Sequence, residues 1–241
     1  MKRSSNRLNC FSPPVMLATL TIETLLAIYT VWRYRLNNAT RLIVAMLVGL
    51  ATFQLAEYHV CTSTGAPVPW SRLGFVAITA LPPLGVHLMH VLAGKKQRRM
   101  VAAVYALMVA FMAFFLVCHV FTGEQCTGNY VIFQFSDWVT GTYSVYYYGL
   151  LILGIWLGTI WSNDLQKQGK KTRRQVQSTR GLIVGYFVFL VPVAVANTIR
   201  PKTRDGIPSI MCGFAVLLAV IMVTYILPRV GKLRHAKPQQ F

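Results

Sequence analysis

Acidic side chains are scarce in this sequence. Six Asp and Glu stand against 24 Lys and Arg in 241 residues, and all charged residues together make up 12% of the chain. A soluble globular domain contains about 25% charged residues, whereas hydrophobic residues reach 55% here. This composition excludes an ordinary soluble domain and indicates an integral membrane protein.

Long polar stretches are also missing, which leaves no room for a separate soluble domain. A helix needs roughly 20 apolar residues to cross a hydrocarbon core of about 30 Å. The first apolar run follows Pro13 and Pro14 and lacks a small-residue cleavage pattern, so we expect it to be retained rather than removed as a signal peptide. The predicted fold class is all-α, a single seven-helix membrane domain over residues 1–241. Its predicted spans are residues 14–32, 42–60, 72–93, 100–121, 143–162, 181–199 and 207–228.

Basic residues are divided unevenly between the two ends of the predicted bundle. Most lie in the connections after the first, third and fifth spans and in the C-terminal tail. Lys and Arg in short loops stay on the cytoplasmic side of a membrane. We therefore expect the N-terminus outside, the C-terminus in the cytoplasm, and a multi-pass protein of the plasma (inner) membrane.

The net charge of +18 does not indicate nucleic-acid binding, because the basic residues are dispersed over short connections rather than gathered on one soluble fold. Basic residues beside a span attract anionic lipid headgroups, by about 1 kcal/mol each. Membrane lipids are therefore the expected partners. The connection NDLQKQGKKTRRQVQSTR, residues 163–180, is also long enough to contact a cytoplasmic signalling partner.

Two of the five cysteines fall on the expected outer side, where conditions are oxidising. Cys61 closes the second span and Cys126 lies in TGEQCTGN. We predict a disulfide between them, although spacing alone does not establish connectivity. Cys118 and Cys212 lie within spans and are expected to pack as small hydrophobic side chains.

The segment from 122 to 142 alternates in a way that favours strand structure. Apolar or aromatic residues stand at 131, 133 and 135 between turn-forming glycines, which predicts a short strand or hairpin. The disulfide would hold this segment as a lid over the outer end of the bundle. The alternative is that its aromatic residues only form an interfacial belt: Trp138, Tyr143, Tyr146, Tyr147 and Tyr148.

Ionisable and polar residues inside spans are costly and commonly mark functional sites. Glu23 falls near the middle of the first span, and Glu57 lies near the outer end of the second, three residues after Gln54 on the same face. These three residues could form the polar floor of an outward-opening ligand pocket. Arg72 begins the third span at a similar depth, either as a further ligand contact or as a purely structural partner of Glu57.

Metal binding has weak support. His59 and His119 are possible zinc or haem ligands at the outer surface. Glu57 and His59 are two residues apart, however, so they point about 160° away from each other around a helix. We therefore expect neither a metal nor another cofactor.

Prolines fall inside two predicted spans. Pro82 and Pro83 interrupt the third in ITALPPLGVHLMH, and Pro192 interrupts the sixth in VFLVPVAVAN. Each proline removes a backbone donor and frees a carbonyl one turn earlier, which is tolerated in a membrane where neighbours satisfy the freed group. The breaks would suit a ligand-responsive hinge or a passive bend.

Several seven-helix families are excluded. The last span has no lysine for a retinal Schiff base, the third lacks the acidic-Arg-aromatic triplet of rhodopsin-like receptors, and the last two spans lack the histidines of zinc-dependent lipid hydrolases.

The order of several short motifs resembles the seven-helix N-terminal sensor region of bacterial sensor histidine kinases and diguanylate cyclases. The motifs are AEYHV, PWSRLGF, LPPLG, YSVYYYG, KKTRRQVQSTRG and FLVPVAVAN. The resemblance implies an outward-facing sensory domain with Glu57, Trp70, Pro82 and Pro192 at pocket or hinge positions. In that family a signalling module follows the last span, whereas only a short tail follows it here.

The predicted function is that of a sensor- or receptor-like membrane protein. It would bind a small molecule or lipid in an outward-facing pocket and signal through a partner at its inner loops. The alternatives are a small transporter or channel and a membrane metallo- or redox enzyme. No nucleophile, base and orienting group can be recognised together in the sequence, so we do not expect catalysis.

Overall fold

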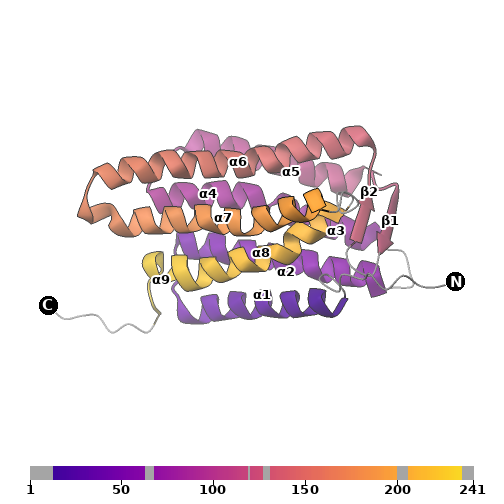
Figure 1. Ribbon diagram of the computed structural model, residues 1–241, viewed down its shortest axis with the longest axis horizontal. Coiled ribbons are helices and arrows are strands. Elements are labelled where there is room, and N and C mark those ends of the chain that lie inside the picture. The colour runs from indigo at the N-terminus through magenta and orange to yellow at the C-terminus, as the bar shows by residue number, and fades with distance from the viewer. Residues whose placement is uncertain (1–12, 63–67, 119, 127–130, 200–205, 235–241) are drawn as a thin grey trace.

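The computed structural model describes residues 13–62, 68–118, 120–126, 131–199 and 206–234. Helices account for most of them (Figure 1). The first five are α1 (Pro13–Arg33), α2 (Asn38–Thr62), α3 (Val68–Thr79), α4 (Leu81–Ala93) and α5 (Arg98–Val117). A two-stranded sheet of β1 (Gly123–Cys126) and β2 (Val131–Gln134) separates these from α6 (Asp137–Lys167), the short turn η2 (Lys170–Thr172), α7 (Arg173–Ile199), α8 (Ile207–Ile221), the π-helical η4 (Met222–Ile226) and α9 (Leu227–Val230).

The described residues contain seven helices long and apolar enough to cross a membrane, which confirms the predicted number. The third joins α3 to α4 and the seventh joins α8, η4 and α9. The direction in which they cross a membrane stays a prediction. Large apolar side chains cover much of the outer surface, among them Leu25, Val109, Val145 and Ile152, as is expected of helix faces that contact lipid tails.

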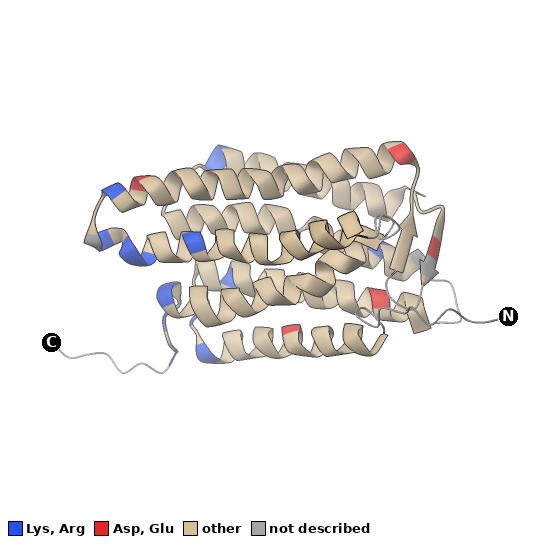
Figure 2. Cartoon of the chain, viewed as in Figure 1, with Lys and Arg blue, Asp and Glu red and all other residues tan. Residues whose placement is uncertain are grey.

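The long helices lie side by side, with the strands at one end of the bundle and the start of the C-terminal tail at the other (Figure 1). We refer to these as the hairpin end and the basic end. Figure 2 shows that Lys and Arg gather toward the basic end; within the described segments, Arg72 is the one such residue at the hairpin end. α2, α4 and α8 are the most deeply buried helices, whereas α1 and α5 lie at the periphery.

Close helix approach depends on glycine at several crossings. A Cβ added to Gly85 in α4 would collide with the Tyr186 hydroxyl of α7, and one added to Gly158 in α6 would lie 2.7 Å from Met89 Cε. Small residues permit such tight packing where no hydrophobic effect drives helices together in lipid.

The helix break predicted at Pro82 and Pro83 is confirmed, since α3 ends at Thr79 and α4 begins at Leu81. Pro83 has no N–H to donate to the Thr79 carbonyl. The Tyr146 hydroxyl of α6 donates to that carbonyl instead, over 2.7 Å. Pro192 lies inside α7, which continues as a helix through this residue; the bend or hinge expected there stays a prediction.

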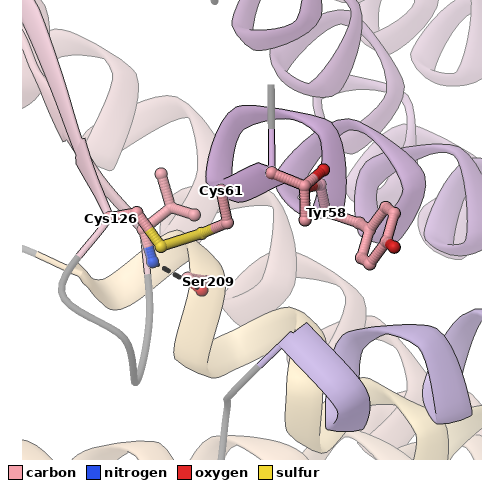
Figure 3. Close-up of a disulfide and its surroundings, with 6 residues drawn as sticks. Tyr58, Cys61, Cys126 and Ser209 are labelled. Atoms are coloured by element: carbon pink, nitrogen blue, oxygen red, sulfur yellow. Dashed lines mark hydrogen bonds between the residues drawn. A yellow bond between two sulfur atoms is a disulfide. The ribbon is translucent and has the colours of Figure 1, made fainter. Parts of the chain in front are cut away.

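The predicted hairpin and disulfide are both present. β1 and β2 pair antiparallel with Cys126 opposite Val131, and Cys126 is bonded to Cys61 at the end of α2 with a Cα–Cα distance of 5.4 Å. The Val131 amide also donates to the Ser209 hydroxyl oxygen of α8 over 3.3 Å. The hairpin is therefore fastened to two helices that are far apart in the sequence (Figure 3).

Candidate functional site

A partly open cavity of about 470 Å³ lies under the hairpin. Its walls come from α3, α5, β2, α6 and α8, so the hairpin strand forms part of the wall. Small-molecule sites are typically concave, apolar and of this size. The phenylalanines of the wall are Phe75, Phe115, Phe133 and Phe135, and its tyrosines are Tyr143, Tyr147 and Tyr148.

The aromatic wall is built around Phe75, which is fully buried. Its ring centroid lies 5.2 Å from that of Phe115, 5.0 Å from Phe133 and 4.8 Å from Phe135, mostly in edge-on or tilted arrangements. Such geometries are favourable for aromatic pairs. Phe75 thereby joins α3, α5 and the hairpin strand into one preformed surface.

Tyr143 connects the cavity to the proline break. Its ring lines the cavity, and its hydroxyl lies 3.1 Å from the Thr79 hydroxyl, where either group can donate. Thr79 is the last residue of α3, and its carbonyl accepts the hydrogen bond from Tyr146 described above. Tyr143 therefore links the cavity wall to the junction of α3 and α4.

The belt interpretation of the Tyr-rich segment is wrong for Tyr143 and Tyr146. Tyr146 is 5% exposed and Tyr143 is also buried, whereas Trp138, one turn earlier, is 63% exposed. Trp138 is thus exposed as a belt residue would be, while Tyr143 and Tyr146 are buried and Tyr147 and Tyr148 are half-buried. The sequence does contain a signal for buried tyrosines. The Pro-Pro pair leaves a backbone carbonyl without its usual donor, and the tyrosines of YSVYYYG in another span can supply a hydroxyl to it.

The three polar residues predicted in the first two spans are all buried. Glu23 is 0% exposed, and Gln54 and Glu57 are each 1% exposed. Within the described chain, no hydrogen-bond partner reaches either Glu23 carboxyl oxygen, Glu57 Oε1 or Gln54 Nε2. Buried polar groups without partners are rare and costly, which makes this cluster a candidate binding site.

The structure brings the acids of this cluster together beside the cavity. Glu23 of α1 and Glu57 of α2 are close enough to interact electrostatically. Ser209 of α8 places its hydroxyl near the Glu57 carboxyl, and Cys212, one turn further along α8, interacts with both acids. Cys212 also lines the cavity, so α8 contributes to the cavity wall one turn from the residue that approaches Glu57.

The five residues predicted as ligand contacts do not themselves line the cavity. Glu23, Gln54 and Glu57 lie in the interior near Cys212. Trp70 stacks on His59, with ring centroids 4.0 Å apart and planes within 11°. Arg72 donates from Nη1 to the Leu116 carbonyl of α5 over 3.0 Å.

The suggested structural pairing of Glu57 with Arg72 is not seen. Both residues are described, and the Arg72 guanidinium is directed to α5 while Glu57 Oε1 has no partner. Glu57 therefore lacks a protein counter-charge from this arginine.

No metal-ligand cluster stands out in the described segments, where no three His, Cys, Asp or Glu side chains gather suitably for an ion. The His59 ring stacks on the Trp70 ring instead. His119, the other candidate, lies outside the described residues.

Glu124 is a further acid at the hairpin end that the sequence did not single out. It lies in β1 opposite Phe133. Burial raises the pKa of its carboxyl, and the nearby Ser71 hydroxyl of α3 partly offsets this rise.

No protein-family model matches this sequence, and no curated protein matches it either. The functional conclusion therefore depends on the geometry of the chain itself.

Proposed function

We propose that this protein is a sensor- or receptor-like membrane protein of the plasma membrane that binds a small molecule or lipid in the cavity under the hairpin. It signals through a partner at the basic end, as the predicted resemblance to bacterial sensor regions implies. The observation that carries the proposal is the preformed aromatic cavity of about 470 Å³, covered by a disulfide-held hairpin.

The charge distribution supports an outward-facing cavity. Lys and Arg gather at the end opposite the hairpin (Figure 2), and such residues remain on the cytoplasmic side. The disulfide at the hairpin end suits an oxidising exterior. In this orientation the basic loops meet anionic lipid headgroups and a cytoplasmic partner.

The elements that line the cavity also lead to the basic end. A ligand on Tyr143 acts on the Thr79 junction, beyond which α4 runs toward the basic loop at Lys95 and Lys96. A ligand on Met211 and Cys212 acts on α8, which continues through η4 to Arg229. A ligand shifts such a bundle only if it binds one arrangement more tightly than another, and the junction at Ala80 provides a place where the helix axis can change.

A closed binding site is better supported than a transport path. The cavity next to the first holds about 20 Å³ and shares Tyr147, Met211 and Cys212 with it. Apart from Tyr147 and Tyr186, its lining is aliphatic, sulfur-containing or Phe. A path for a polar solute would need polar groups along its length.

Native mass spectrometry of gently solubilised protein tests the proposal. Ser144→Trp fills the cavity, because Ser144 lines it. Val145→Trp is the matched control, because the next residue points about 100° away around the helix and is 75% exposed. We expect a co-purifying small molecule or lipid on wild type and the control variant, and its loss from Ser144→Trp. If all three proteins carried the same ligand in the same amount, a site in this cavity would be refuted.

A further inference from the structure

The cavity under the hairpin has an electrostatic character opposite to that of the chain. The protein carries a net charge of +18, yet no Lys, Arg or His is among the described residues that line the cavity. Its one charged lining residue is Asp137, exposed at the start of α6. An anionic ligand would find no counter-charge there, so the lining selects a neutral or cationic molecule.

The aromatic wall favours the cationic choice. The faces of Phe and Tyr rings attract cations, above all alkylated ammonium groups whose hydration is weak. Rings converge on the cavity from three helices and the hairpin, with Phe75, Phe133 and Tyr143 among them. The apolar part of an amphiphilic cation would be buried on the same surface.

The two buried acids supply the complementary charge. In the described part of the chain, both carboxyl oxygens of Glu23 and Oε1 of Glu57 lack a hydrogen-bond donor. A buried carboxylate without donors is strongly disfavoured in its ionised form unless a counter-charge approaches. The Ser209 hydroxyl lies near the Glu57 carboxyl, and Cys212 follows Ser209 by one turn of α8. Cys212 lines the cavity, so a positive group seated at its thiol lies within the field of both carboxyls.

We propose that the ligand of this cavity is a hydrophobic organic cation, of the substituted-ammonium class, whose charged group lies at Cys212 beside Glu57 and Glu23 while its apolar part lies on the ring of Phe75. This inference rests on the proposed function, because it names the ligand class of the same site. Asp137 contributes a weaker attraction at the mouth of the cavity, where solvent screens it.

A charge-matched ligand series tests the inference. The probes are benzyltrimethylammonium, its neutral isostere neopentylbenzene, and the anion phenylmethanesulfonate, measured by ligand-detected NMR on the full chain in nanodiscs with empty nanodiscs subtracted. We expect the cation to bind at least about tenfold more tightly than its neutral isostere, as a combined aromatic and carboxylate attraction predicts. The anion should give no binding above the empty discs.

Two variants locate the charge that is recognised. Glu57→Gln keeps the shape of the side chain and should lower the affinity for the cation by about tenfold, with the neutral isostere unchanged. Asp137→Asn should lower it by less. The wild-type series needs no variant, so the inference stays testable even if Glu57→Gln fails to fold.

The outcomes separate this inference from the proposed function. Equal affinity for the cation and the neutral isostere, or tighter binding of the anion, would overturn the organic-cation assignment while leaving a ligand site in the cavity. Binding of all probes that Ser144→Trp does not reduce, or no binding of any probe, would overturn both.

Discussion

The hairpin end and the basic end of the bundle are closed by different means. At the hairpin end a disulfide and a single backbone bond to Ser209 hold two strands over a cavity. Buried carboxyl oxygens beside that cavity remain without donors among the described residues. At the basic end, loop groups find partners: the Asn37 amide donates to the Val230 carbonyl over 3.0 Å, and Tyr34 pairs with Leu233.

This difference supports the proposed ligand site under the hairpin. Polar groups that are fully paired fix one arrangement, as at the junction of α1, α2 and α9. Polar groups beside a cavity that lack a partner in the protein can form a hydrogen bond or ion pair with a bound molecule. The two ends should therefore respond differently to substitutions, and binding should depend chiefly on the hairpin end.

The largest effect is expected from loss of the disulfide. Cys61→Ser releases the hairpin from α2, and removing a native disulfide typically costs about 2–4 kcal/mol of unfolding free energy. We expect a lower melting temperature, faster proteolysis between β1 and β2, and loss of the ligand from the cavity. The matched control is Cys118→Ser, since Cys118 is a free, exposed cysteine at the same end. Unchanged melting and binding in Cys61→Ser would mean that packing alone holds the hairpin.

A smaller and separable effect is expected at the basic end. Asn37 caps α2, because its Oδ1 accepts hydrogen bonds from the Thr40 amide at 2.9 Å and the Thr40 hydroxyl at 3.0 Å. Asn37→Ala should cost about 1 kcal/mol of stability, as loss of an N-cap does, without changing probe affinity at the cavity. Thr224→Ala is a control with only an intrahelical bond to lose. If Asn37→Ala also weakened probe binding at the cavity, the two ends of the bundle would be energetically coupled.

The smallest effect is a pH dependence of the hairpin. The pKa of Glu124 is raised above 4.5 in the folded protein, chiefly by burial, so the folded state holds this proton more tightly than the unfolded state does. Its stabilising contribution is present below pH 4.5 and is lost as the pH rises through the folded pKa. Amide hydrogen exchange across β1 and β2 should therefore quicken as the pH rises through that window, after correction for the intrinsic exchange rate. Glu124→Gln should remove this component, and an identical profile in the variant would assign it to another group.

Much of the architecture could be predicted from local signals. Span number follows from hydropathy, the hairpin from alternation at 131, 133 and 135, and the helix break from Pro82 and Pro83, all of which the structure contains. The predicted link between Cys61 and Cys126 is also present. Pro192 lies within the continuous helix α7, so a local proline signal alone does not separate a break from a bend.

The cavity could not be predicted in the same way. Its central residues, Phe75, Phe115 and Cys212, lie in spans where nearly every residue is apolar. In a soluble helix, polarity separates the buried face from the exposed face, but in lipid both faces are apolar. Val145 and Tyr146 are neighbours in one such run, yet the first is exposed and the second is buried.

By itself, the sequence determined the seven apolar helices, the uneven placement of basic residues and the burial of Glu23, Gln54 and Glu57, since each depends on the cost of placing particular groups in hydrocarbon. Only the tertiary structure decided that Tyr146 would bond to Thr79, that Arg72 would turn to α5 instead of Glu57, and that two acids would meet beside an aromatic cavity. Those outcomes depend on which helix faces pack together, and packing is set by shape and hydrogen bonding between segments distant in the chain.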